Sequence, residues 1–276
     1  MTEVDLKYQR LRSVLAEYGR VLVAFSGGVD SSFLLRVASE VLPGNVVALT
    51  VHSPTVPEED HLTAVCLAQA LAVEHVVIEA DELAMPEYAA NPTNRCYFCK
   101  SHLFELCAQE AGRRGIPVVV DGANADDLRD YRPGLTAAHE RGVRHPLVEA
   151  GLTKAEVRVL SRQLGLPTWD KPASPCLSSR FPYGTPITHE ALERVASAER
   201  LLRGLGFREC RVRYHDRLAR IEVPVEHLAR LLEPDVRTRV VAGLRELGFL
   251  HVTVDLQGFR SGSLNEALVE RKNPAA

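Results

Sequence analysis

The segment Ser26-Gly27-Gly28-Val29-Asp30-Ser31-Ser32 contains the residue types that bind a polyphosphate. Its two glycines permit close approach of the backbone, and the amides at a helix N-terminus attract an anion. The hydroxyls of Ser31 and Ser32 add donors, and the Asp30 carboxylate can hold Mg²⁺ against the phosphates. The segment matches neither the Walker A loop nor the dinucleotide fingerprint. It predicts a phosphate-binding loop of another type, with a serine-capped turn as the alternative.

Cysteines form the second group of candidate residues. Cys96 and Cys99 have Cys-x-x-Cys spacing, and Cys176 lies on a proline-rich loop. Arg180, four residues after Cys176, could lower the pKa of that thiol or bind a phosphate. The remaining three cysteines lie within apolar patterns, which predicts small buried hydrophobic side chains. These are Cys66, Cys107 and Cys210.

Two arginines near the C-terminus are candidates for binding an anion. Arg211 and Arg213 are two residues apart, so on a strand their side chains share one face. Paired guanidinium groups suit a phosphate. A solvated strand face is the alternative interpretation.

The elements that position these residues follow from the hydrophobic pattern. Short apolar runs alternate with helical patterns, which predicts an α/β fold with a doubly wound parallel sheet. Ligands in such folds bind beyond the carboxyl ends of the strands. Gly122, just after the last of these strands, is therefore a further nucleotide-binding candidate. The expected strands are Val21–Phe25, Val46–Val51, His75–Ile78 and Pro117–Val120; the expected helices are 3–18, Ser32–Val41, Glu58–Leu71 and Tyr97–Arg113.

The pattern changes near residues 172–186, where prolines crowd together, and a smaller α+β domain is expected beyond them. Its strands are predicted at Cys210–Tyr214, Ala219–Val223 and His251–Leu256, and its helices at His189–Leu205, Val225–Leu232 and Asp235–Leu247.

Composition limits the classes of function. Hydrophobic residues make up 46% and charged residues 25% of the 276 residues, which is typical of a globular protein. The net charge of −3 provides no overall basic field for nucleic acid. The most apolar stretch, Ala64–Val73, is shorter than the ~20 residues that a bilayer needs. The N-terminus does not resemble a signal peptide, and six cysteines then indicate reduced thiols and a cytoplasmic location.

The phosphate-binding segment resembles the pyrophosphate loop of the AMP-forming ATP pyrophosphatases, which include NAD, GMP and asparagine synthetases and several tRNA thiolases. Those enzymes adenylate an oxygen of the substrate and release pyrophosphate. Two further segments, Cys176–Gly184 and Asp130–Gly134, closely resemble the LarE family of sulfur transferases. The similarity continues through Cys210–His215 and Gly258–Gly262, so it covers about residues 5–265.

The resemblance implies an enzyme that adenylates the carboxylates of pyridinium-3,5-biscarboxylic acid mononucleotide and converts them to thiocarboxylates for a nickel-pincer nucleotide. It implies ATP and Mg²⁺ as cofactors, a small-molecule substrate rather than nucleic acid or membrane, and a homo-oligomer. Residues 1–171 would form the ATP pyrophosphatase domain and 172–186 an active-site linker loop. Residues 187–270 would form an α+β domain for binding the substrate phosphate and for oligomerisation.

The resemblance also implies roles for single residues. Cys176 matches the family's sulfur-carrying cysteine, and Arg211 and Arg213 match its substrate-phosphate residues. Glu199 matches a metal-binding carboxylate, with an ordinary surface glutamate as the alternative.

In the best-known LarE form, the counterpart of Cys176 donates its own sulfur and becomes dehydroalanine in a single turnover. That form lacks the Cys-x-x-Cys of Cys96 and Cys99. Three thiolates suit a [4Fe–4S] cluster, which normally takes four, and leave one iron open for sulfide. We therefore expect a recycled, cluster-dependent mechanism. A zinc site that adds His102, a redox dithiol, two unrelated thiols and the sacrificial route are the alternatives.

Three other functions compete with this one. A tRNA thiolase needs a basic RNA-binding surface. An amidotransferase-type synthetase needs an ammonia source and has no use for Cys176. A nucleotide-binding regulator would carry out no chemistry.

Overall fold

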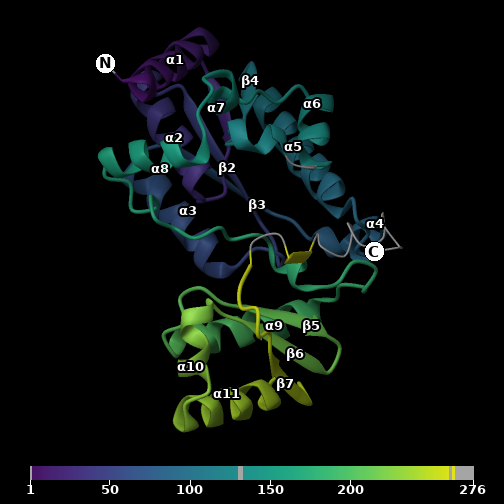
Figure 1. The fold of residues 1–276 in the computed structure, drawn as a ribbon. Helices are drawn as coiled ribbons and strands as arrows, with labels where there is room; N and C mark the ends of the chain where they lie inside the picture. Colours follow the sequence, from purple (N-terminus) through teal and green to yellow (C-terminus); the bar gives the residue numbers. More distant parts are fainter. Residues whose placement is uncertain (1, 130–132, 261–262, 265–276) are drawn as a thin grey trace, which may run out of the picture. The chain divides into compact units, whose positions relative to one another are not determined.

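The computed structural model describes residues 2–129, 133–260 and 263–264 (Figure 1). The chain divides into two compact units. The first contains the residues up to Glu82 together with Thr93–Ser174, and the second contains Leu83–Pro92 and the chain from Pro175 onward. Among the described residues, no helix is long and apolar enough to cross a membrane.

A four-stranded parallel sheet forms the centre of the first unit, with the strand order β3-β2-β1-β4. Alternate residues of β1 enter two different cores: Val21 and Val23 lie in one, and Leu22 and Ala24 lie in the other. Both faces of the central strands β1 and β2 are therefore buried, which is why these two strands are almost continuously apolar. The strands are β1 (Val21–Ala24), β2 (Val46–His52), β3 (Glu74–Glu79) and β4 (Val118–Val120).

Helices cover both faces of this sheet (Figure 1). One face packs against α1 (Glu3–Tyr18), α2 (Val29–Val41), α3 (Glu58–Ala70), α7 (Pro146–Glu149) and α8 (Lys154–Gln163). The other packs against α5 (Arg95–Arg113) and α6 (Pro133–Glu140). The predicted doubly wound α/β fold is confirmed. The connecting elements are η1 (Glu82–Ala84), α4 (Pro86–Ala89) and η2 (Ala125–Arg129).

The start of α2 differs from the sequence-based expectation. The apolar periodicity begins at Ser32, but the helix begins at Val29, with the extended residue Gly28 as its N-cap. Asp30 and Ser31 are polar, so they carry no helical hydrophobic signal although they form the first helical turn. The candidate phosphate-binding residues therefore lie at a helix N-terminus, where backbone amides are free to bind an anion.

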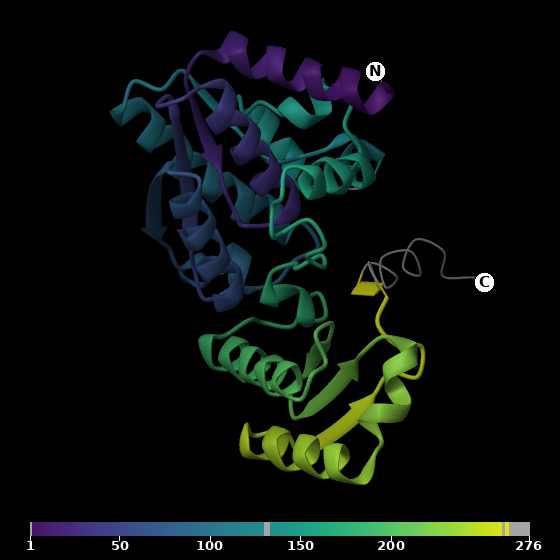
Figure 2. The same ribbon diagram turned by 90° about the vertical axis from the view of Figure 1, so that its left-hand side faces the viewer.

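The second unit contains a three-stranded sheet of order β5-β6-β7. Strands β5 and β6 are antiparallel, and β7 adds to β6 in parallel. Figure 2 shows α9 and α11 beside this sheet, and residues of both helices share a core with β5 and β6. The elements are η3 (Leu177–Arg180), α9 (His189–Gly204), β5 (Arg211–His215), β6 (Leu218–Glu222), η4 (Val225–His227), α10 (Leu228–Leu231), α11 (Pro234–Glu246) and β7 (His251–Val254).

Candidate active site

The loop after β1 is closed by its own serine hydroxyls. Ser31 Oγ accepts a hydrogen bond from the Ser26 N–H at 3.3 Å and lies 3.1 Å from Ser26 Oγ. The same hydroxyl donates to the Gly28 carbonyl at 3.3 Å. Ser32 is completely buried, and its hydroxyl has no hydrogen-bond partner among the described residues, so its expected role as a donor to the phosphates stays a prediction. Ser26 and Ser31 are the hydroxyls that lie at the loop.

Two glycines make the close contacts that fix this loop. Gly27 has φ +67°, and a Cβ there would lie 2.9 Å from the Ala64 amide nitrogen in α3. At Gly122 a Cβ would lie 2.8 Å from the Ser31 amide nitrogen. The loop after β4 therefore touches the start of α2. Strands β1 and β4 are neighbours at the point where the strand order reverses, which is the usual ligand site in such sheets.

Asp30, in the first turn of α2, has one paired and one unpaired carboxylate oxygen. Its Oδ2 accepts a hydrogen bond from Lys154 Nζ at 2.5 Å. Its Oδ1 is buried and has no hydrogen-bond partner among the described residues. Burial raises the pKa of Asp30, against the opposing influence of the Lys154 ammonium. An oxygen of this kind fits a divalent cation, since Mg²⁺ binds carboxylate oxygens together with substrate phosphates.

A second lysine also lies at the loop. Lys171 Nζ donates to the Gly27 carbonyl at 3.1 Å and forms an ion pair with Asp60 of α3 at 2.8 Å. Lys171 and Lys154 together place two ammonium groups beside a loop that the sequence predicts to bind a triphosphate. Neither lysine was a sequence-based candidate, because each lies more than 120 residues from its loop partner and belongs to no local motif.

In the second unit, Arg180 fixes the loop that contains Cys176. The Arg180 guanidinium forms a two-point ion pair with Glu199, at 2.8 and 3.0 Å. Its Nη1 donates to the carbonyls of Pro175 at 2.7 Å and Cys176 at 3.2 Å. The charge-assisted bonds hold the backbone of the cysteine loop in one position. Arg180 therefore has a structural role here, in addition to the thiol or phosphate role expected from sequence.

Glu199 is completely buried, so it is not an ordinary surface glutamate. Besides Arg180, it accepts hydrogen bonds from the Val212 N–H at 3.1 Å and from Arg203 at 3.4 Å. Both of its oxygens are thus engaged by protein donors. The role of Glu199 as a metal ligand stays a prediction, and the structure shows it supporting Arg180 instead.

Arg213 and Arg211 lie on the same face of β5 and are both buried, so this is not a solvated strand face. Arg213 pairs with Glu222 through two contacts of 2.8 Å and donates to the Ser179 carbonyl at 2.7 Å. The Arg211 guanidinium has no ion pair or hydrogen bond within the described residues, and it lies 4.4 Å from the centre of the Phe259 ring.

The electrostatics of Arg211 favour an anion. Burial and the neighbouring charges of Arg180 and Arg213 lower the pKa of Arg211 to about 10. Its positive charge is therefore destabilised by its surroundings, and a bound phosphate would compensate it. An anion site at this face of β5 stays a prediction, and these electrostatics favour it.

The candidate cysteines are divided between the units. Cys96 is exposed and Cys99 half-buried in the first two turns of α5, three residues apart and hence on one helix face. Cys176, half-buried, directly precedes η3 in the second unit. Within the part of the chain that the structure describes, no three side chains of the metal-ligating types come together as a metal site.

Comparison with known proteins decides the family. A family profile described as NAD synthase matches residues 4–94. Over 271 residues, the chain is 40% identical to the pyridinium-3,5-bisthiocarboxylic acid mononucleotide synthase of Lactiplantibacillus plantarum, with 98% of each chain covered. The chain belongs to this synthase family, the LarE family. The resemblance expected from the sequence motifs is thereby confirmed.

Other relatives extend this comparison. An uncharacterized Synechocystis protein, slr1717, is 48% identical over 267 residues, which is 97% of this chain and all of that protein. The tRNA-specific 2-thiouridylase MnmA of Xanthobacter autotrophicus is 28% identical over 197 residues, covering 56% of this chain and 49% of that protein. The similarity to the tRNA enzyme is thus partial, whereas the similarity to the LarE family spans the chain.

Two motifs that suggested the LarE family lie partly outside the described residues. The segment Asp130–Gly134 includes residues 130–132, which the structure does not describe. The segment Gly258–Gly262 likewise includes residues 261–262, which lie outside the described residues. Of the other predictions, Cys107 and Cys210 are buried as expected, but Cys66 is exposed. The buried face of α3 consists of Ala64, Leu67 and Ala68, and the helical period places Cys66 away from it.

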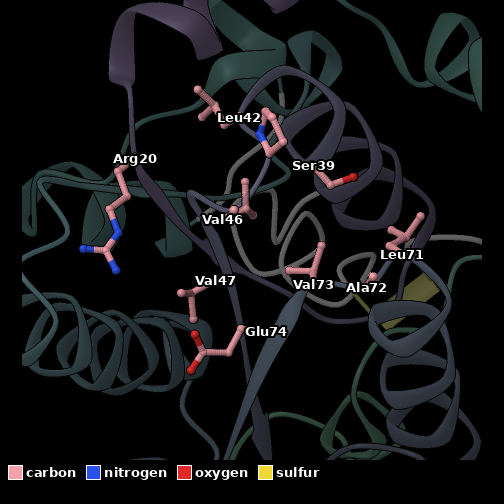
Figure 3. A pocket seen from close by; sticks show the side chains of 11 residues that line it. Arg20, Ser39, Leu42, Val46, Val47, Leu71, Ala72, Val73 and Glu74 are labelled. Carbon is pink, nitrogen blue, oxygen red and sulfur yellow. The ribbon is translucent and has the colours of Figure 1, made fainter.

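A cavity of about 360 Å³ lies at the opposite end of the sheet, where β2 and β3 begin (Figure 3). Arg20 lies at its rim and donates to the Arg114 carbonyl at 2.9 Å. Glu74, also at the rim, pairs with Arg114. Both charged groups are occupied by protein partners, and the cavity contains none of the candidate catalytic residues of this LarE-family chain.

Proposed function

We propose that the protein is an ATP-dependent sulfur transferase that acts on pyridinium-3,5-biscarboxylic acid mononucleotide. It adenylates the carboxylates with release of pyrophosphate and converts them to thiocarboxylates, a step in the biosynthesis of the nickel-pincer nucleotide cofactor. The observation that carries this proposal is the near full-length identity of 40% to a synthase named for that product. The phosphate-binding geometry of the first unit and the anion-binding geometry of the second support it.

In the first unit, the amides at the start of α2 and the Lys154 and Lys171 ammonium groups would hold the triphosphate. A substrate carboxylate then attacks the α-phosphorus, and pyrophosphate leaves. The free Oδ1 of Asp30 is the oxygen that would bind Mg²⁺, which neutralises charge on the phosphates when it is bound.

In the second unit, the phosphate of the mononucleotide would bind to Arg211 and Arg213. Arg213 is already fixed by Glu222, so its guanidinium is preorganised, while Arg211 provides uncompensated charge. The Arg180–Glu199 pair would keep the neighbouring Cys176 loop in place. Binding of this kind orients the carboxylates for adenylation.

For the sulfur, we propose cluster ligation by Cys96, Cys99 and Cys176. The two thiols of α5 fit part of such a ligand set, because they share one helix face and are accessible. A bound [4Fe–4S] cluster would supply an open iron for sulfide. The alternative is that Cys176 donates its own sulfur and becomes dehydroalanine.

Anaerobic purification and reaction distinguish the two routes. If the cluster is present, the protein is brown, Cys96→Ala and Cys99→Ala lose the colour and multiple turnover, and Cys176 keeps its mass. The matched control is Cys66→Ala, which removes an exposed thiol of α3 and should leave colour and turnover unchanged. Dehydroalanine at position 176 after one turnover of the reconstituted protein would refute the cluster route.

The remaining features of the proposal concern partners. We propose a small-molecule enzyme that forms a homo-oligomer in the cytoplasm and needs neither nucleic acid nor membrane. The partial match to MnmA and the net charge of −3 favour this over a tRNA thiolase. Release of AMP that depends on the mononucleotide, and not on tRNA, tests the choice.

A further inference from the structure

A carboxylate–imidazole pair lies at the carboxyl edge of the large sheet, and the proposed steps have not used it. Asp121 directly follows β4, and its Oδ1 lies 2.6 Å from His145 Nδ1. The backbone of Arg144 pairs with β4 as a one-residue parallel bridge to Val120. The hydrogen bonds from Asp121 N–H to the Arg144 carbonyl and from Arg144 N–H to the Val119 carbonyl fix this bridge. Parallel pairing brings both side chains to the same end of the sheet.

The pair is preorganised and partly accessible. The Asp121 side chain is 11% exposed and that of His145 is 20% exposed. The Asp121 carboxylate also accepts the Ala123 N–H at 3.0 Å. Because the carboxylate binds Nδ1, the neutral imidazole keeps its proton there and presents Nε2 as a base. Within the described residues, Nε2 has no hydrogen-bond partner.

The pair lies close to the phosphate loop within the same unit. Gly122 directly follows Asp121, and a methyl group added at this glycine would lie 2.8 Å from the Ser31 amide nitrogen at the start of α2. The backbone after β4 is therefore in contact with the helix start. The α-phosphate of a nucleotide bound at that helix start, and hence an acyl group attached to it, would be near this edge of β4.

The charges around His145 come from three elements. Asp121 after β4 and Glu149 on α7 favour the imidazolium, whereas burial and Lys100 on α5 disfavour it. Glu149 is shared with Arg144 and Tyr18. The balance raises the pKa of His145 above its ordinary value of 6.5. The pKa of Asp121 is lowered by His145 and Lys100 in spite of burial, so its carboxylate stays ionised.

We infer that His145, oriented by Asp121, is the general base of the sulfur-transfer step. A hydrosulfide attacks the adenylated carboxyl carbon, the C–S bond forms and the bond between that carbon and the phosphate oxygen breaks. AMP leaves with the electron pair, and the S–H proton passes to Nε2 of His145. One acyl adenylate, one hydrosulfide and a neutral imidazole thus give one thiocarboxylate, AMP and an imidazolium.

This inference rests on the proposed function and separates its two steps. Adenylation by an ionised carboxylate transfers no proton, whereas a hydrosulfide must lose its S–H proton in forming the thiocarboxylate. Loss of the base should therefore slow sulfur transfer and spare adenylation. General bases contribute about 10²- to 10⁴-fold, so the sulfur step should fall by at least about 10²-fold.

The test uses the full-length, anaerobically prepared protein with ATP, Mg²⁺, the dicarboxylate mononucleotide and sodium sulfide. His145→Gln should retain substrate-dependent exchange of pyrophosphate into ATP and lose thiocarboxylate formation. His139→Gln, which changes an exposed histidine of α6, is the matched control and should retain both. Retained exchange shows that the His145 variant is folded.

The pH profile gives a readout that a structural role would not move. In the wild type, the rate of the sulfur step should rise with pH through the raised pKa of His145, because only the neutral imidazole is a base. Asp121→Asn removes the anion that stabilises the imidazolium. The rising limb of the pH–rate profile, where the rate increases with pH, should therefore move to lower pH. Wild-type sulfur transfer and an unchanged pH limb in His145→Gln would overturn the inference. Absence of pyrophosphate exchange in the wild type would instead contradict the proposed function.

Discussion

The Lys154 ammonium lies 2.5 Å from Oδ2 of Asp30, joining two residues that are 124 positions apart. The lysine begins α8, and the aspartate lies in the first turn of α2. This ion pair leaves Asp30 Oδ1 as a buried oxygen without a hydrogen-bond partner among the described residues. The start of α2 thus combines free amides, a fixed cation and an oxygen suited to a second cation, which is the charge arrangement that a nucleotide triphosphate requires.

Asp30→Ala should abolish pyrophosphate release while the fold remains intact. It removes the oxygen available to Mg²⁺ and leaves Lys154 without its partner, so we expect a loss of at least about 10²-fold in kcat. Mononucleotide-dependent pyrophosphate release measures this. Glu17→Ala, which removes an exposed carboxylate of α1, should have no effect. Wild-type turnover of the Asp30 variant would show that the α2 start does not bind the reacting nucleotide.

Arg211→Ala and Arg213→Ala should differ in their effects on stability. Each should weaken substrate binding by about 1.5–3 kcal/mol, seen as a higher KM, if each makes a charge-assisted bond to the phosphate. Only Arg213→Ala leaves a buried carboxylate, Glu222, without its main partner. We therefore expect it alone to lower the free energy of unfolding, by about 3 kcal/mol.

Steady-state kinetics and urea denaturation of the two variants give these values. An unchanged KM for the mononucleotide in Arg211→Ala would contradict the anion site on β5. Equal losses of stability in both variants would contradict the assignment of Arg211 as the uncompensated charge.

The pair formed by Arg180 and Glu199 should show strong coupling. Arg180→Met should destabilise the protein by about 3 kcal/mol, because it leaves a fully buried carboxylate with fewer donors. Adding Glu199→Leu should recover part of that loss, since the unpaired charge is then removed as well. A double-mutant cycle in urea measures the coupling, and strictly additive losses would contradict it.

Gly122→Ala should weaken ATP binding. The added methyl group would lie 2.8 Å from the Ser31 amide nitrogen, so either the start of α2 or the loop after β4 must move. We expect a loss of about 1–3 kcal/mol in ATP affinity, measured by calorimetry. Gly112→Ala is the control, because nothing lies within 4 Å of its added methyl group. If both variants bind ATP like the wild type, the contact does not shape the site.

The sequence predicts the fold well where the physical signal is local. Runs such as Val46–Val51 are almost continuously apolar because both faces of the strand are buried, and the structure has a strand there. In the first turn of α2 the polar residues Asp30 and Ser31 interrupt this signal, and only Val29 joins the apolar core there. The exposure of Cys66 was missed because an apolar neighbourhood does not indicate which face of a helix a residue occupies.

The candidate site depends on contacts between distant segments, and these cannot be predicted from spacing. Lys154 and Lys171 reach the phosphate loop only because the α/β fold brings α8 and the following segment to the carboxyl edge of the sheet. The face shared by Arg211 and Arg213 follows from strand periodicity, but their burial follows from the packing of the second unit. The joint ligation of Cys96, Cys99 and Cys176 stays a prediction.

The most direct test of the central claim is the mass of the mononucleotide after anaerobic incubation of the protein with ATP, Mg²⁺ and sulfide. We expect the mass to increase by the difference between sulfur and oxygen, first once and then twice, with one AMP formed for each replacement. A mononucleotide of unchanged mass, in the presence of folded and ATP-binding protein, would contradict the assignment of this chain as a carboxylate-to-thiocarboxylate sulfur transferase.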